Sequence, residues 1–117
     1  MNVKFEIKHI NKSPFLSVKN DVFSVNFLIY NADNLINGFK KVKKMFLKNK
    51  NVTIDSLASE SPEINVITLS GKKLKLEAAD SLYEVPGCHL VIDFSDFDSG
   101  VISNLFDNLI EDLEELE

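Results

Sequence analysis

The chain lacks several residue types, and each absence excludes a class of protein. Its 117 residues include no tryptophan, no arginine, a single cysteine and only four glycines. One cysteine excludes an intrachain disulfide, which is typical of proteins of a reducing cytoplasm. The four glycines form no phosphate-binding loop pattern. Without arginine, the chain has no bidentate donor for guanine or phosphate.

Long apolar runs are absent as well. No stretch approaches the ~18 consecutive apolar residues that a membrane span requires. The first ten residues alternate between polar and apolar, unlike the apolar segment of a secretory signal. We therefore expect a cytoplasmic protein with no membrane partner. A hydrophobic content of 44% with nine phenylalanines is sufficient for a core, and the length fits one domain over residues 1–117.

Basic residues are missing from the last third of the chain. Residues 1–50 contain ten lysines and three acids, a net charge of +7, whereas residues 51–117 contain three lysines and fifteen acids, a net charge of −12. No basic residue follows Lys75, but twelve acids do. A surface of one sign accelerates association with a partner of the opposite sign. The charge pattern therefore predicts a partner that is recognised electrostatically.

Six strands are predicted from alternating or short continuous apolar patterns. Their ranges are 3–7, 22–30, 52–57, 64–70, 74–78 and 88–94. Asn11–Pro14 contains turn-forming residues and ends the first strand. The second range ends in a continuous apolar run, so we expect burial to increase towards Tyr30. Gly71-Lys72 predicts a hairpin, and Pro86-Gly87 predicts a further turn.

Two helices are predicted from apolar residues at helical spacing. The first follows Asp33 as its N-cap and ends at Asn49 or Asn51. Its expected buried face is Leu35, Ile36, Phe39, Val42 and Phe46, and its opposite face carries Lys40, Lys41, Lys44 and Lys48. The second follows Asp98 or Ser99, with an apolar stripe of Ile102, Phe106, Leu109, Leu113 and Leu116. The order β-β-α-β-β-β-β-α predicts a single α+β domain with a mostly antiparallel sheet.

Catalytic and metal-binding groups are scarce. Cys88 and His89 are neighbours on a predicted strand, so their side chains point to opposite faces and cannot form a catalytic pair. Carboxylates cluster at Asp93–Asp98, but a glycine follows Asp96 by four residues and the twelfth loop position is Asp107, which does not match a calcium loop. We therefore expect no metal, no cofactor and no enzymatic activity.

The lysine face of the first helix has two interpretations. It could contact nucleic acid phosphates, or it could be a solvated face whose charges complement the helix dipole. The rest of the chain is acidic and would repel nucleic acid, and no aromatic residues interleave with these lysines. We expect no nucleic acid partner.

The last helix is acidic near its C-terminal end, where each carboxylate is disfavoured by roughly 0.3–1 kcal/mol. No lysine is placed four residues away to pair with these acids. Two interpretations remain: a solubilising acidic tail, or a surface kept negative for a basic partner. The second interpretation assigns partner binding to Asp96, Asp98, Asp107, Glu111 and Glu114.

This profile of small size, acidity, missing catalytic groups and an α+β pattern resembles that of bacterial immunity proteins from polymorphic toxin systems, such as contact-dependent growth inhibition. The resemblance covers the whole chain and contains no diagnostic motif. It implies binding to a cognate basic toxin domain, often a nuclease, which the immunity protein neutralises. Two alternatives are a self-associating domain, in which the basic helix of one copy meets the acidic helix of another, and a phage-encoded mimic of nucleic acid.

Overall fold

The computed structural model describes residues 3–55, 57, 63–78 and 89–116. These residues form two helices and two antiparallel sheets, which confirms the predicted α+β class. The elements are β1 (Lys4–Ile10), β2 (Ser13–Lys19), β3 (Ser24–Leu28), α1 (Ala32–Leu47), β4 (Val52–Ile54), β5 (Ile64–Ser70), β6 (Lys73–Ala78), β7 (His89–Asp93) and α2 (Ser99–Glu114).

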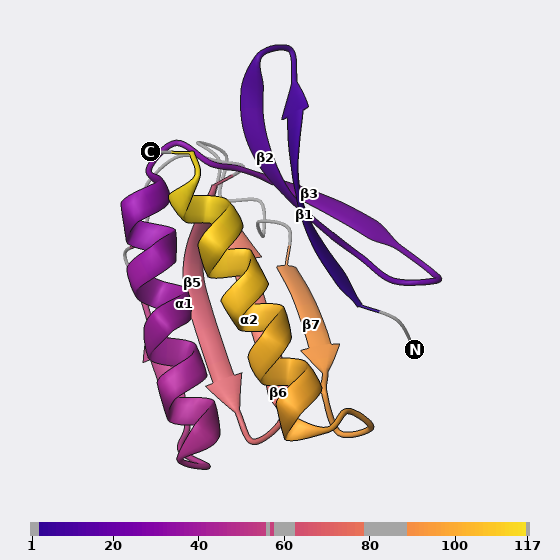
Figure 1. Ribbon diagram of the computed structural model, residues 1–117, viewed down its shortest axis with the longest axis vertical. Coiled ribbons are helices and arrows are strands. Elements are labelled where there is room, and N and C mark those ends of the chain that lie inside the picture. The colour runs from indigo at the N-terminus through magenta and orange to yellow at the C-terminus, as the bar shows by residue number, and fades with distance from the viewer. Residues whose placement is uncertain (1–2, 56, 58–62, 79–88, 117) are drawn as a thin grey trace.

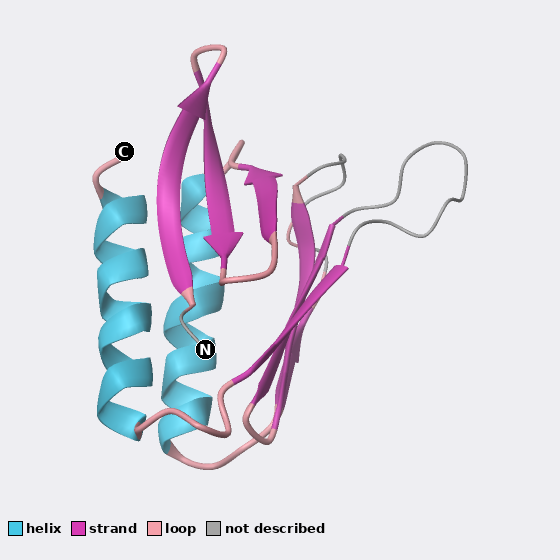
Figure 2. Ribbon diagram, turned by 90° about the vertical axis from the view of Figure 1, so that its right-hand side faces the viewer, coloured by secondary structure: helices cyan, strands magenta, loops and turns pink. Residues whose placement is uncertain are grey.

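The two sheets have the strand orders β1-β2-β3 and β4-β5-β6-β7. A parallel bridge between Leu28 and Glu63 connects them. Helices α1 and α2 lie side by side over one face of the four-stranded sheet (Figure 1). Figure 2 shows the three-stranded sheet at the upper end of this layer, between the helices and the larger sheet. Strand β1 packs against α2, and β5 packs against α1.

One strand was missed by the sequence prediction. Asn11 and Lys12 form a two-residue hairpin loop with φ values of +50° and +69°, as in a type I′ turn. Strand β2 therefore starts at Ser13, within the segment Asn11–Pro14 that was predicted to be a break. The observed order is β-β-β-α-β-β-β-β-α, and one predicted sheet is in fact two.

Burial in the region of β3 also differs from the prediction. Ile29 is buried as expected, but the next residue, Tyr30, is 84% exposed. The amide of Ile29 donates to the carbonyl of Pro14 at 3.0 Å, so the chain follows β2 up to Ile29 and then turns away into α1. Strand β4 is three residues shorter than predicted, β5 is as predicted, and the Pro86-Gly87 turn lies outside the described residues.

Helix α1 has the predicted buried face but a different N-cap. Asn31 is the cap, because its side-chain Oδ1 accepts a hydrogen bond from the amide of Asn34 at 3.3 Å. Asp33 instead lies in the first turn, where a carboxylate complements the helix dipole. Asn49 follows the helix with a φ of +56°, the left-handed conformation typical of a C-terminal cap.

Helix α2 begins after Asp98, as predicted, although that side chain makes no capping hydrogen bond. Its stripe of Ile102, Phe106, Leu109 and Leu113 is buried, and Leu116 is half-buried. Neither described helix has the length and apolar character that crossing a bilayer requires.

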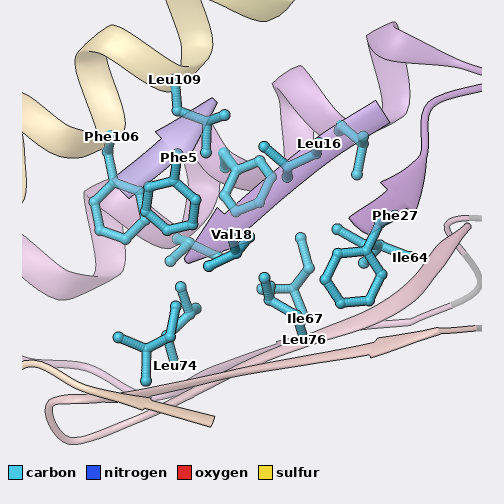
Figure 3. Packing of buried hydrophobic residues seen from close by; sticks show 14 of the residues in the cluster. Phe5, Leu16, Val18, Phe27, Ile64, Ile67, Leu74, Leu76, Phe106 and Leu109 are labelled. Atoms are coloured by element: carbon cyan, nitrogen blue, oxygen red, sulfur yellow. The ribbon is translucent and has the colours of Figure 1, made fainter. Parts of the chain in front are cut away.

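One continuous core connects both sheets with both helices (Figure 3). Phe106 of α2 lies at its centre, with ring centroids 6.4 Å from Phe39 of α1 and 6.1 Å from Phe94 after β7. Leu16 and Val18 of β2 belong to the same core. The missed strand therefore supplies part of the core.

Candidate binding surface

Helices α1 and α2 run side by side in opposite directions (Figure 1), and charged residues of both line the groove between them. Asp107, Glu111 and Glu114 are spaced by four and three residues, so they share one side of α2. This side faces α1. A groove between the two helices is lined by Lys40, Lys43, Lys44 and Leu47 from α1 and by Asp107, Ile110, Glu111 and Glu114 from α2. One wall of the groove is basic, and the other is acidic.

An ion pair crosses this groove between Lys43 and Asp107. The Lys43 side chain is 26% exposed and that of Asp107 is 51% exposed, so solvent screens the pair and it contributes about 1 kcal/mol or less. Sequence analysis found no partner for Asp107 because the two residues lie 64 positions apart. Lys43 directly follows Val42 of the buried face, so it lies at the border of the apolar stripe of α1. This position was the only signal in the sequence that Lys43 would lie next to another element.

The other side of α2 also has basic neighbours. The charged and titratable residues that line a second hollow are Lys4, Glu6 and His9 of β1 together with Asp112 and Glu115 of α2. Helix α2 therefore lies between two elements of the basic half of the chain. The charge asymmetry along the sequence is partly balanced within the folded domain.

Four carboxylates near the end of α2 have basic residues nearby but form no ion pair with a described residue. Glu111, Asp112, Glu114 and Glu115 are all exposed. Within the part of the chain that the structure describes, ion pairs join Lys19 to Glu6, Lys43 to Asp107 and Lys75 to Glu77, and none involves these four residues. The last turn of α2 contains no basic residue. Negative charge without an ion-pair partner among the described residues therefore remains at the C-terminal end of α2.

The remaining predicted binding residues, Asp96 and Asp98, lie elsewhere. Both precede the first turn of α2, whose 16 residues span about 24 Å at 1.5 Å per residue. Glu111 and Glu114 lie near the other end of that helix. The five predicted residues thus form two separate groups, with Asp107, Glu111 and Glu114 together and Asp96 and Asp98 apart.

The carboxylate cluster at Asp93–Asp98 has a structural role at its first residue. Asp93 Oδ1 accepts hydrogen bonds from the backbone amide of Ser95 at 2.9 Å and from its hydroxyl. These two bonds lower the pKa of Asp93 and fix the turn after β7. Across residues 3–55, 57, 63–78 and 89–116, no three His, Cys, Asp or Glu side chains come close enough to share a metal ion.

Of the Cys88–His89 pair, only His89 is described. It occupies the first position of β7 and is exposed. Cys88 lies outside the described residues, so its position relative to His89 stays a prediction.

Comparisons of this chain with protein families, with characterised proteins and with solved structures found no match.

Proposed function

We propose that this protein binds a basic partner protein through the acidic end of α2 and, in the manner of small immunity proteins, neutralises a cognate toxin domain in the cytoplasm of the producing cell. The observation that supports this proposal is the group of exposed carboxylates Glu111, Asp112, Glu114 and Glu115, none of which forms an ion pair with another described residue. The proposed activity is binding, with no catalytic step.

The position of these carboxylates supports a role in recognition. Negative charge at a helix C-terminus is disfavoured by roughly 0.3–1 kcal/mol per group, and mutual repulsion adds to this cost. A helix selected for stability alone would carry lysine in its last turn, as α1 does with Lys44. Residues that reduce stability at an exposed site are expected where binding depends on them.

A basic toxin domain is a suitable partner on physical grounds. A nuclease must hold phosphates, so its substrate groove is positively charged. A negative surface on an inhibitor accelerates its association with such a groove and competes with the substrate. Among the predicted carboxylates, Glu111 and Glu114 contribute most within this proposal, and Asp107 contributes less because it pairs with Lys43. Asp96 and Asp98, at the other end of α2, lie outside this surface.

The alternative of self-association is less well supported. It requires the basic helix of one copy to meet the acidic helix of another. Lys43 and Asp107 make this same type of contact between α1 and α2 within one chain. Lys40 and Lys44 of the lysine face line the same groove, so this face already has acidic neighbours within one chain.

The test takes as its candidate partner the basic C-terminal domain of a large secreted protein, if one is encoded immediately upstream, and measures the association of that domain with this protein. We expect Glu111→Lys and Glu114→Lys each to slow association several-fold and to weaken its dependence on ionic strength. Asp21→Lys is the matched control, because it makes the same charge change at an exposed turn in the basic half of the chain. Co-expression should also protect cells from this domain.

Equal association rates for Glu111→Lys, Glu114→Lys and Asp21→Lys would place the interface away from α2. A large loss in Lys40→Glu or Lys44→Glu, with no change in the glutamate variants, would place it on α1. Absence of both binding and protection would contradict the proposed function itself.

A further inference from the structure

Tyr30 is an exposed aromatic residue at the end of the segment that follows β3. Its side chain is 84% exposed, whereas every phenylalanine that the structure describes is buried or half-buried. Single exposed apolar residues are common on protein surfaces, so exposure alone does not indicate a function. The backbone and the neighbours of Tyr30 provide the further argument.

The backbone that carries Tyr30 is fixed on both sides. The preceding amide, of Ile29, donates to the carbonyl of Pro14 at 3.0 Å. The following residue, Asn31, is the N-cap of α1 and accepts from the amide of Asn34. The ring is therefore presented from an ordered position. A tyrosine held in this way loses little conformational entropy when it binds a partner.

Tyr30 borders a hollow where α1 begins and α2 ends. The chain end after α2 lies beside the start of α1 in both ribbon views (Figures 1 and 2). The hollow is lined by Pro14, Ile29, Tyr30, Asn31, Ala32, Asp33 and Leu116. It contains one carboxylate and no lysine.

The hollow adjoins the acidic end of α2. Leu116 lines it and directly follows Glu114 and Glu115, two carboxylates without an ion pair among the described residues. Asp33 contributes negative charge from the first turn of α1. The nearest lysine along α1 is Lys40, almost two helical turns after Asp33. The charged residues nearest to this hollow along α1 and α2 are therefore negative, and the nearest basic residues of β1, Lys4 and His9, line the adjoining hollow beyond Leu116.

We propose that Tyr30 is the central contact of the binding surface, and that it stacks against an arginine of a basic protein segment. A guanidinium stacks on an aromatic face and also donates in a fork to carboxylates. Asp33, Glu114 and Glu115 would supply these carboxylates. An aromatic side chain surrounded by polar groups is the usual composition of an interface hot spot. The inference deepens the proposed function by naming the contact that a basic partner makes.

The test uses a nine-residue polyarginine peptide, titrated into the ¹⁵N-labelled protein and followed by NMR. We expect chemical-shift changes at Tyr30, Asp33 and Leu116. Tyr30→Ala should weaken peptide binding about tenfold, because truncation of a central aromatic contact typically has this effect. Tyr30→Phe retains the ring and should bind almost as well as the native protein. A polylysine peptide should bind more weakly, because an ammonium cannot stack as a plane.

Val22→Ala is the matched control. Val22 is highly exposed (86%), as Tyr30 is, and is not among the residues that line the groove or either hollow, so its truncation should leave peptide binding unchanged. Native-like peptide affinity in Tyr30→Ala would overturn the inference, and so would shift changes confined to the Lys43–Asp107 groove. Concentration-dependent dimerisation that Tyr30→Ala abolishes would assign the surface to a second copy and would also overturn it.

The peptide experiment separates this inference from the proposed function, since it requires no toxin domain. Peptide binding at Tyr30, together with no binding to the neighbouring-gene domain, would contradict only the toxin partner. Toxin binding that is unaffected by Tyr30→Ala would contradict only the role of Tyr30.

Discussion

Phe106 is the residue whose truncation most directly tests the packing of α2. Its side chain is fully buried and contacts Phe39 of α1 and Phe94 after β7. An aromatic side chain of this type buries at least about 150 Å², which at about 25 cal/mol per Å² amounts to nearly 4 kcal/mol. The ring contacts add about 0.5–1.5 kcal/mol per pair. We therefore expect Phe106→Ala to reduce the free energy of unfolding by about 3–5 kcal/mol.

The assay is urea unfolding followed by circular dichroism, with the free energy extrapolated to water. A loss of this size is a large fraction of the roughly 5–15 kcal/mol that stabilises a typical domain. Phe106→Leu should lose less because it fills part of the cavity. Val101→Ala is the control on the same helix, since Val101 is 47% exposed and its truncation should cost under about 0.5 kcal/mol. A loss in Phe106→Ala no larger than in the control would refute the packing of α2 against the core.

Three further predictions concern a pair of glycines and two ion pairs. Gly71→Ala should destabilise the β5–β6 hairpin by about 1 kcal/mol, because Gly71 has a φ of +62°. Gly100→Ala, in open space in the first turn of α2, should instead stabilise by up to about 1 kcal/mol in the same urea assay. Lys19 lowers the pKa of Glu6 by a hydrogen bond and by its charge, with their atoms 2.9 Å apart. Because the folded pKa is the lower one, the pair stabilises the fold above the unfolded pKa of Glu6, and this stability is lost as the pH falls through the folded pKa. Lys19→Met should raise the Glu6 pKa in an NMR titration, and an unchanged pKa would contradict the pairing. A double-mutant cycle on Lys43 and Asp107 should give a coupling of about 0.2–1 kcal/mol that decreases at high salt, whereas no coupling at low salt would show that the pair contributes nothing.

Local patterns were sufficient to predict most of the elements. The buried faces of both helices follow from apolar spacing within a single segment, and β5 alternates clearly enough to be bounded correctly. Strand β2 was missed because Pro14 and the residues before it read as a break. In the fold, Asn11 and Lys12 both adopt positive φ and reverse the chain within two residues. The pairing with β1 that stabilises this reversal depends on contacts between strands, which a single-segment pattern does not contain.

The candidate surface was only partly predictable for a related reason. Helical spacing correctly placed Asp107, Glu111 and Glu114 together, because their proximity is local. The pairing of Asp107 with Lys43 depends on the antiparallel packing of α1 and α2. The exposure of Tyr30 depends on the point at which the segment after β3 stops pairing with β2, which is Ile29. A continuous apolar run predicted burial there, because sequence patterns do not show where a chain turns out of a sheet.

Asp107 and Glu114 allow a direct test of which carboxylates of α2 stabilise the fold and which destabilise it. Both are exposed, and both line the same side of α2, so neutralising either one makes the same change in net charge. Asp107 pairs with Lys43, whereas Glu114 lies in the last turn, where the helix dipole opposes it. Asp107→Asn should therefore lower the free energy of unfolding by about 0.2–1 kcal/mol. Glu114→Gln should raise it by roughly 0.3–1 kcal/mol, and both effects should diminish as salt screens them. If Glu114→Gln also destabilises the protein, the acidic end of α2 belongs to the network of charges that holds the domain together. If it stabilises the protein and at the same time slows association with a basic partner, the charge reduces stability and serves recognition.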